Sequence, residues 1–217
     1  MRFYNRTEAG RALAAALMAY AQRPDVLVLG LPRGGVAVAY EVARALQVPL
    51  DLLLVRKLGV PGQEELALGA LASGEVRVLN ERVIHELAIP ESIIEAATAN
   101  AERELMRRER LYRGHRPAPQ VQGRVIILVD DGVATGATMQ AAIMVIRRQH
   151  PARLVVAIPV APPSVYEEIQ AQVDELVCLM TPEVFMGVGV WYEDFSQLTD
   201  RQVRTLLEQA RKLEAGC

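Results

Sequence analysis

Two adjacent carboxylates, Asp130 and Asp131, stand out as residues that could do chemistry because of what precedes and follows them. Five apolar residues, Val125 to Val129, come directly before the pair. A turn of small and polar residues comes directly after it: Gly132, Val133, Ala134, Thr135, Gly136, Ala137 and Thr138. A β-branched apolar run that ends in a Gly-rich turn predicts a buried parallel strand leading into a helix, here over Met139 to Arg148.

This arrangement places the turn at the carboxyl end of a strand, where open α/β sheets bind ligands. Small residues let backbone N–H groups approach a phosphate, and the helix amino terminus adds partial positive charge. The hydroxyls of Thr135 and Thr138 add donors. Two acids repel a phosphate but suit sugar hydroxyls or a metal ion, so a sugar phosphate is the ligand class that fits. The alternative is that Asp and Gly serve turn geometry alone.

Residues 125–138 resemble the phosphoribosyl-pyrophosphate signature of the type I phosphoribosyltransferases. The resemblance implies an α/β fold with a Rossmann-like core, a parallel twisted sheet flanked by helices, a small hood and a helical insertion. It implies that the turn from Gly132 to Thr138 binds phosphoribosyl pyrophosphate and that Ala134 to Thr138 grips its 5′-phosphate. Asp130 and Asp131 would hold the ribose hydroxyls. Mg²⁺ would be held mainly through the substrate, with the two acids as candidate ligands.

A second glycine-rich turn follows an earlier apolar run. The run is Val26 to Leu29, the turn is Gly30 to Gly35, and a helical pattern follows from Val36 to Leu46. The spacing suits a second anion site or a plain tight turn. In the resembled family, Pro32, Arg33, Gly34 and Gly35 take the place of a pyrophosphate-binding loop. Arg33 would then be a bidentate phosphate ligand, and the Pro32–Arg33 peptide bond is predicted to be cis.

The next apolar run, Leu50 to Val55, predicts a strand that ends at Arg56 and Lys57. The resemblance implies that this basic pair faces pyrophosphate, and the alternative is a solvated pair. Leu58 to Glu65 lacks periodicity and is predicted to be a loop. Leu66 to Ala72 and Val76 to Leu79 predict a β-hairpin. In the family a lid lies in this region, and Glu65 is its candidate acceptor contact.

Residues 80–116 are predicted to be a helical insertion. Asn80 can cap a short helix to Leu87, and a longer helix opens at Pro90 or Glu91. Interleaved glutamates can pair with its arginines at a spacing of four residues, which favours a solvated helix face. The end of the segment is expected to fold over the active site, with Arg113 or Arg116 reaching phosphate.

The last strands and the tail complete the prediction. Leu154 to Ile158 and Glu175 to Leu179 predict two more strands, so alternating strands and helices imply a parallel sheet with right-handed crossovers. A hood over residues 180–197 concentrates aromatic side chains in a chain with 5% aromatics. They could stack on a base or form a satellite core. The candidate base contacts are Phe185, Trp191, Tyr192 and Asp194. The lysine with which purine-specific relatives recognise their base is not found.

Length and composition fit one globular domain, residues 1–217, with a core over 24–160. Hydrophobic residues make up 51% and charged residues 23%, and the net charge is −2. This balance predicts no general attraction to nucleic acid or to a membrane. Two cysteines without metal-like spacing, Cys178 and Cys217, and the lack of a signal-peptide pattern predict a cytoplasmic protein.

The resemblance therefore implies a phosphoribosyltransferase that uses phosphoribosyl pyrophosphate and Mg²⁺. It would transfer phosphoribose to a nitrogenous, purine-like base and release pyrophosphate. The expected assembly is a homodimer. The catalytic set would be Asp130, Asp131, Arg33 and Lys57. Some family members carry an acid where this chain has Ala134, so either Glu65 or Asp194 is the general base or the reaction needs none. One alternative is a regulatory relative that binds nucleotides with little or no transfer. Another is a hydrolase of phosphorylated sugars, for which no convincing nucleophile is present.

Overall fold

Five apolar runs form one parallel sheet in the computed structural model, which describes residues 2–60, 63–74, 76–114 and 116–215 but not the side chains of 63–66, 214 and 215. The strands lie in the order β2-β1-β6-β7-β8. Their bounds are β1 Val26–Gly30, β2 Leu50–Leu52, β6 Val125–Val129, β7 Arg153–Val160 and β8 Glu175–Met180. Every residue of β1 and β6 is buried, as expected for a sheet with helices on both faces.

The order of the strands fixes where a ligand can bind. From β1 the chain moves outward to β2, whereas from β6 it moves outward in the opposite direction to β7 and then β8. The order therefore reverses between β1 and β6, which pair in parallel from Val26–Val125 to Gly30–Val129. Open α/β sheets bind ligands beyond the carboxyl ends of the strands at such a switch point.

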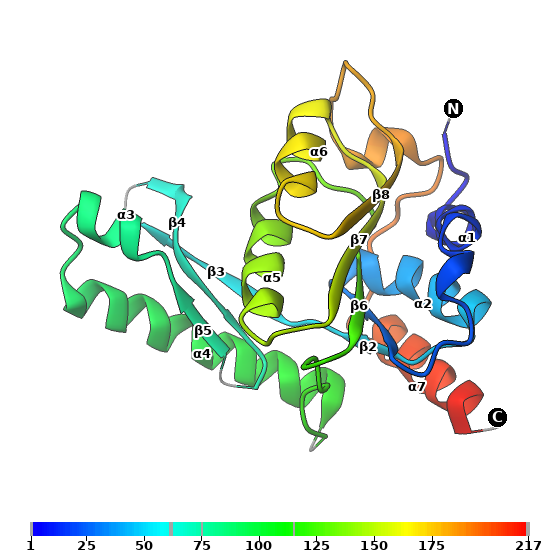
Figure 1. Cartoon of the computed structure of the whole chain (residues 1–217), viewed down its shortest axis with the longest axis horizontal. Coiled ribbons are helices and arrows are strands. Elements are labelled where there is room, and N and C mark those ends of the chain that lie inside the picture. The colour runs from blue at the N-terminus through cyan, green and yellow to red at the C-terminus, as the bar shows by residue number, and fades with distance from the viewer. Residues whose placement is uncertain (1, 61–62, 75, 115, 216–217) are drawn as a thin grey trace. The chain divides into compact units, whose positions relative to one another are not determined.

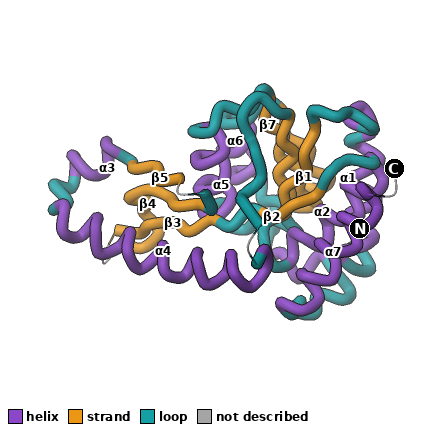
Figure 2. Tube along the Cα trace, turned by 90° about the horizontal axis from the view of Figure 1, so that it is seen from below, coloured by secondary structure: helices purple, strands orange, loops and turns teal. Residues whose placement is uncertain are grey.

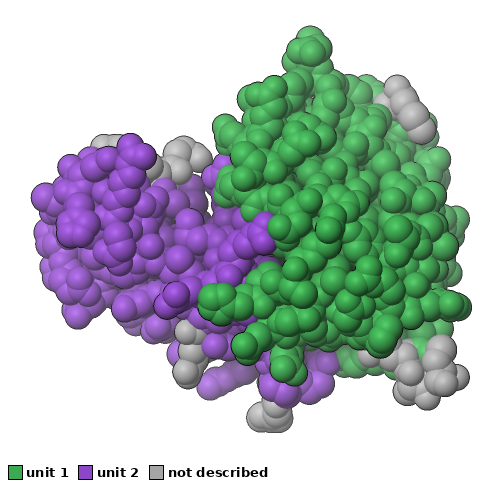
Figure 3. Space-filling model, in the orientation of Figure 1, with its two compact units in different colours: residues 1–52, 120–136, 150–217 green, residues 53–119, 137–149 purple. Residues whose placement is uncertain are grey.

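Helices cover this sheet on both faces. Helices α1 (Arg6–Ala16) and α2 (Gly34–Leu46) pack on each other along one face, and α6 (Pro163–Gln170) lies on the opposite face (Figure 1). Helix α7 (Asp200–Ala215) packs on α2 and β2. This part of the chain also contains two short 3-10 helices, Met18–Tyr20 and Val188–Trp191. These elements belong to unit 1, which comprises Met1–Leu52, Gln120–Gly136 and His150–Cys217 (Figure 3).

Unit 2 comprises Leu53–Pro119 and Ala137–Gln149 and is built on an antiparallel sheet. Its strands are β3 (Val55–Val60), β4 (Gln63–Ala72) and β5 (Val76–Leu79). Its helices are α3 (Glu81–Glu86), α4 (Glu91–Arg113) and α5 (Ala137–Arg147). Helix α4 runs alongside β3 and β4 (Figure 2), and α5 packs on the same strands. As predicted, Asn80 caps α3, because its side chain accepts a hydrogen bond from the Val83 amide.

The structure corrects two predictions in this region. The run Leu50 to Val55 is not one strand, because the parallel strand ends at Leu52 and a new antiparallel strand begins at Val55. The predicted loop from Leu58 to Glu65 is largely strand, since β3 extends to Val60 and β4 begins at Gln63. The two residues that link β2 to β3 are also apolar and buried, so hydrophobicity alone could not mark the change of partner. The hairpin at Ser73–Gly74 is confirmed.

Several other elements match their predictions within a few residues. They include β1, α2, β6, α5, β7 and β8. Cys178 is a half-buried free thiol in β8, and Cys217 and His115 lie outside the described residues. No helix in the described part of the chain is long and apolar enough to cross a membrane.

Candidate active site at the switch point

The loops that follow β1 and β6 lie against each other. The amide of Leu31 donates a hydrogen bond to the carbonyl of Val129 at 2.9 Å. A Cβ atom at Gly35 would lie 2.8 Å from the Asp130 Cα and the Val129 carbonyl oxygen. A Cβ atom at Gly34 would collide with Oδ2 of Asp131. Both positions therefore require glycine for the loop after β1 to approach the acid pair.

The loop after β1 also has the predicted backbone geometry. The peptide bond between Pro32 and Arg33 is cis, which confirms that prediction. Helix α2 begins at Gly34 without a side-chain cap. Its amino terminus carries partial positive charge and lies next to the carboxylate of Asp131, which a Cβ atom on Gly34 would meet. Arg33 is half-buried at this terminus.

The two acids differ in their electrostatic surroundings. Burial and then the neighbouring charge of Asp131 raise the pKa of Asp130 well above its ordinary value. The side chain of Asp130 accepts a hydrogen bond from the amide of Asp131 at 2.9 Å. Asp131 instead forms an ion pair with Arg6, 2.7 Å from Nε to Oδ2, in which the side chains of Arg6 and Asp131 are 12% and 15% exposed. Of the two acids, Asp130 is therefore the one whose burial favours the protonated form, and Asp131 is the one that pairs with a cation.

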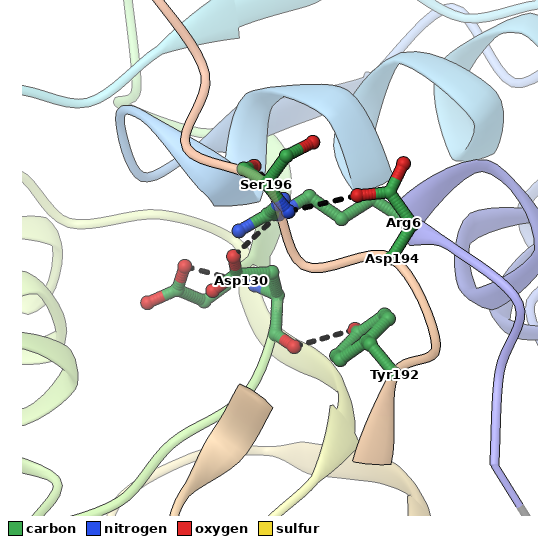
Figure 4. A network of polar contacts seen from close by, with 6 residues as sticks. Arg6, Asp130, Tyr192, Asp194 and Ser196 are labelled. Carbon is green, nitrogen blue, oxygen red and sulfur yellow. Dashed lines mark hydrogen bonds and ion pairs between the residues drawn. The ribbon is translucent and has the colours of Figure 1, made fainter. Parts of the chain in front are cut away.

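Segments from both ends of unit 1 hold Asp131 (Figure 4). The hydroxyl of Tyr192 donates a hydrogen bond to the Asp131 carbonyl at 2.6 Å. Burial and then the charge of Asp131 raise the pKa of Tyr192, so its hydroxyl remains a donor. Arg6 also donates to the Ser196 carbonyl at 2.8 Å, and its guanidinium carbon lies 4.0 Å from the centre of the Phe195 ring. Arg6 was not among the predicted site residues, since it is 125 residues from Asp131 and belongs to no local motif.

The rest of the glycine-rich turn is partly exposed. Gly132 and Gly136 have positive φ angles, and the amide of Val133 is held by the Val160 carbonyl at 2.9 Å. Ala134 and Thr135 are exposed. Exposed small residues anchored by buried neighbours leave backbone N–H groups within reach of an anion. Ala137 and Thr138 open α5, which is assigned to unit 2.

Unit 2 also contains predicted site residues from outside the turn, namely Arg56, Lys57, Glu65 and Arg113. Arg56 and Lys57 lie within β3, opposite Leu71 and Ala70, and not at the end of a parallel strand as predicted. Arg113 is buried at the end of α4, with Nη1 3.9 Å from a carboxylate oxygen of Glu109. Glu65 lies in β4 and its side chain is outside the described residues. Their roles toward phosphate or acceptor stay predictions.

The hood residues divide into two groups. Tyr192 is buried in a cluster with Phe3 and Ala9 and stacks on Phe195 with ring centres 5.0 Å apart. For Tyr192 the structure therefore favours the second of the two predicted roles, packing in a small hydrophobic core, over stacking on a base. Trp191 is half-buried and packs against the same cluster. Phe185 is half-buried, and Asp194 is exposed, with its pKa lowered mainly by a hydrogen bond from the Ser196 amide. Contacts of these three residues with a base stay predictions.

The side chains near the acid pair show how the predicted magnesium ion could be bound. Within the described residues, no three or more His, Cys, Asp and Glu side chains gather into a metal site. Asp130 and Asp131 supply oxygen atoms, the ligand type that Mg²⁺ prefers, but too few to complete six-fold coordination. The residues therefore fit an ion that takes its remaining ligands from a substrate and water.

Comparisons with known proteins point to one family. The family model described as "Phosphoribosyl transferase domain" matches residues 4–193. Two Mycobacterium tuberculosis proteins, named "Putative phosphoribosyl transferase MT0597" (strain CDC 1551 / Oshkosh) and "Putative phosphoribosyl transferase Rv0571c" (strain ATCC 25618 / H37Rv), are each 44% identical over 216 residues. The match covers 99% of this chain and 48% of each relative, so the chain spans about half the length of these proteins.

A solved structure is similar over its whole length. The crystal structure of TT1426 from Thermus thermophilus is 45% identical in sequence and superposes with a TM-score of 0.89. The match covers 96% of this chain and 99% of that chain. Both the sequence and the arrangement of elements are therefore shared with an experimentally determined fold.

Proposed function

Because this chain belongs to the phosphoribosyl transferase domain family, we propose that it transfers phosphoribose from phosphoribosyl pyrophosphate to a nitrogenous base and releases pyrophosphate. The observation that carries the proposal is the contact between the loop after β1 and the acid pair after β6. The carboxylate of Asp131 lies against the space that a Gly34 side chain would fill, at the switch point of the sheet. A cis-peptide loop, a helix amino terminus and two acids thus meet at the edge where the fold binds ligands.

The proposed roles follow from charge. Asp130 and Asp131 accept hydrogen bonds from the ribose hydroxyls and offset the positive charge that develops on the ribosyl carbon. The backbone N–H groups from Ala134 to Thr138 bind the 5′-phosphate, and Arg33 binds the leaving pyrophosphate. A Mg²⁺ ion bound with the substrate would offset the negative charge of the pyrophosphate. Arg56 and Lys57 are the further candidates for that task.

The acceptor is proposed to be a planar, purine-like base. Phe185 and Trp191 are half-buried aromatic side chains, which suits stacking on a base. Asp194 is exposed, and its lowered pKa keeps it ionised at neutral pH, so it can accept a hydrogen bond from a base nitrogen.

Binding of phosphoribosyl pyrophosphate with Mg²⁺ tests the ligand class. We expect calorimetric titration to give binding to the wild type and a loss of about 100-fold or more in Asp130→Asn/Asp131→Asn, since both acceptors of the ribose hydroxyls lose charge. Asp25→Asn is the matched control, because Asp25 pairs with Arg23 on the surface and should bind like the wild type. Wild-type protein that fails to bind would overturn the proposal.

One observation favours a second candidate, a regulatory protein that binds phosphoribosyl pyrophosphate or a nucleotide with little or no transfer. Ala134 stands where some family members carry an acid near the base, so this loop offers no general base. A screen of nitrogenous bases for pyrophosphate release separates the two candidates. Release that depends on one base supports the transferase, whereas tight binding without release from any base supports the regulatory protein.

A further inference from the structure

The first residues of the chain pair with the hood. The amide of Phe3 donates to the Trp191 carbonyl at 2.9 Å, and the amide of Glu193 donates back to the Phe3 carbonyl at 2.9 Å. The amide of Asp194 donates to the Tyr4 carbonyl at 2.8 Å. Phe3 and Tyr192 form a parallel bridge, and their rings lie 5.7 Å apart in a buried cluster. Residues 3–6 and 191–196 are therefore one packed element, called here the terminal clamp.

The terminal clamp holds Asp131 at two points. Arg6 binds its carboxylate at 2.7 Å, and the Tyr192 hydroxyl binds its carbonyl at 2.6 Å. Arg6 is in turn fixed by the Ser196 carbonyl and by the face of Phe195. Figure 4 shows Arg6 and Tyr192 approaching the acid pair from different segments of the terminal clamp. Side chain and main chain of Asp131 are therefore both restrained.

We infer that Arg6 and Tyr192 are positioning residues that hold Asp131 in the orientation needed to bind the ribose of phosphoribosyl pyrophosphate. This inference rests on the proposed function, in which Asp131 accepts hydrogen bonds from the ribose hydroxyls. Neither residue needs to touch the ligand, because each acts through Asp131.

The local chemistry explains why Asp131 needs such support. Its carboxylate is largely buried beside Asp130, and like charges at adjacent positions repel. The ion pair with Arg6 uses Oδ2, on the side where Gly34 leaves room. Without Arg6, the mostly buried carboxylate would lack its cation and would turn toward water. In that orientation Asp131 would be a poorer acceptor for a ribose hydroxyl.

Calorimetric titration of phosphoribosyl pyrophosphate with Mg²⁺ into the whole chain tests the inference. We expect Arg6→Gln to weaken binding about tenfold and Tyr192→Phe to weaken it about threefold, the range of coupling in a shared polar network. Arg6→Lys keeps the charge and should fall between Arg6→Gln and the wild type. It also preserves the test if Arg6→Gln does not fold.

Two matched variants control for structural damage. Arg11→Gln removes an arginine from the same helix whose side chain is 65% exposed and pairs with Glu41. Tyr20→Phe removes a buried hydroxyl that donates to Glu175 at 2.5 Å. Both controls should bind like the wild type, whatever their effect on thermal stability.

A double-mutant cycle separates positioning from direct contact. In the Asp131→Asn background, Arg6→Gln should change the dissociation constant less than about twofold, because the residue through which it acts has been altered. An unchanged tenfold loss in that background would overturn the positioning role and indicate that Arg6 contacts the ligand.

Hydrogen exchange of the ligand-free protein keeps this test separate from the proposed function. Arg6→Gln and Tyr192→Phe should exchange faster at the backbone amides of residues 131–133 and 192–196, whereas the two control variants should not. Unchanged exchange in both segments would overturn the terminal clamp whether or not the protein binds phosphoribosyl pyrophosphate. Changed exchange in a chain whose wild type binds no phosphoribosyl pyrophosphate would instead overturn the proposed function and leave the terminal clamp standing.

Discussion

At the scale of single residues, the protonation of Asp130 makes the stability of the folded chain depend on pH. Its pKa is raised, so between its ordinary value of 3.8 and the folded value the folded chain holds a proton that the unfolded chain has released. The folded state then binds more protons, and stability falls as the pH rises through this interval. The slope reaches at most about 1.4 kcal/mol per pH unit for one group. The buried carboxyl of Asp130 therefore destabilises the ligand-free fold near neutral pH.

We expect Asp130→Asn to be more stable than the wild type near neutral pH and to lose this part of the pH dependence. Urea unfolding at intervals from about pH 4 to about pH 8 measures the effect. Asp25→Asn is an informative comparison, because the pKa of Asp25 is lowered by the hydrogen bond from Arg23 and its contribution has the opposite sign. An Asp130→Asn curve parallel to that of the wild type would contradict the raised pKa.

The sequence could locate Asp130 and Asp131 because strand, acids and turn follow one another along the chain. It could not locate Arg6, since the ion pair forms only when α1 is placed by the whole fold. The aromatic character of Tyr192 also predicted that it contacts a nucleobase. In the structure its hydroxyl donates a hydrogen bond to the Asp131 carbonyl. Local patterns carry no information on which distant side chains will meet.

At the scale of elements, the loop after β1 depends on the two glycines at the start of α2. We expect Gly34→Ala to lower the free energy of unfolding by about 1–3 kcal/mol, as is typical of overpacking, because its Cβ would collide with Oδ2 of Asp131. That atom belongs to a side chain, so most of the cost should disappear in the Asp131→Ala background.

Urea unfolding of the two single variants and the double variant measures this coupling. Gly35→Ala is the contrasting case, because its Cβ would meet the backbone of Asp130 and Val129, which no side-chain truncation relieves. Its cost should therefore persist in the Asp131→Ala background. Equal costs of Gly34→Ala in both backgrounds would show that the collision lies elsewhere.

Element types were predicted well where periodicity was unbroken, as in β6, β7 and α4. The change from parallel to antiparallel pairing between Leu52 and Val55 was not predictable, since a strand's partner is set by hydrogen bonds across the sheet. The region where β3 ends and β4 begins was mistaken for a loop because Gly, Pro and acidic residues weaken the alternating pattern there. Composition describes a segment, whereas pairing depends on its neighbour.

At the scale of the whole molecule, a ligand that binds the folded chain must stabilise it by mass action. At a free concentration of 100 times its dissociation constant, phosphoribosyl pyrophosphate with Mg²⁺ should add about 2.7 kcal/mol to the free energy of unfolding. Scanning calorimetry should show a higher midpoint for the wild type and a much smaller shift for Asp130→Asn/Asp131→Asn, since a 100-fold weaker site gains only about 0.4 kcal/mol at that concentration. Mg²⁺ with inorganic phosphate is the control. A shift of equal size with that control would indicate a general anion effect.

The alternation of strands and helices predicted the parallel sheet, but not the order of its strands. That order places the switch point between β1 and β6, so the two glycine-rich turns become neighbours although about 100 residues separate them. The division into two units was also absent from the sequence, because unit 2 is assembled from two separate stretches of chain.

The pairing of residues 3–6 with residues 191–196 has a consequence for how the protein is made. A chain emerges from the ribosome with its amino terminus first, so Asp131 emerges well before Tyr192 and Ser196. Tyr192 binds the Asp131 carbonyl, and Ser196 binds Arg6, the partner of the Asp131 carboxylate. Contacts so distant in sequence close late, because the entropy of the intervening loop opposes them. During synthesis Arg6 can meet Asp131 early, but the terminal clamp that fixes both can form only after residues 191–196 have emerged. A nascent chain therefore carries Asp131 without the support of Tyr192 and Ser196 until that segment docks.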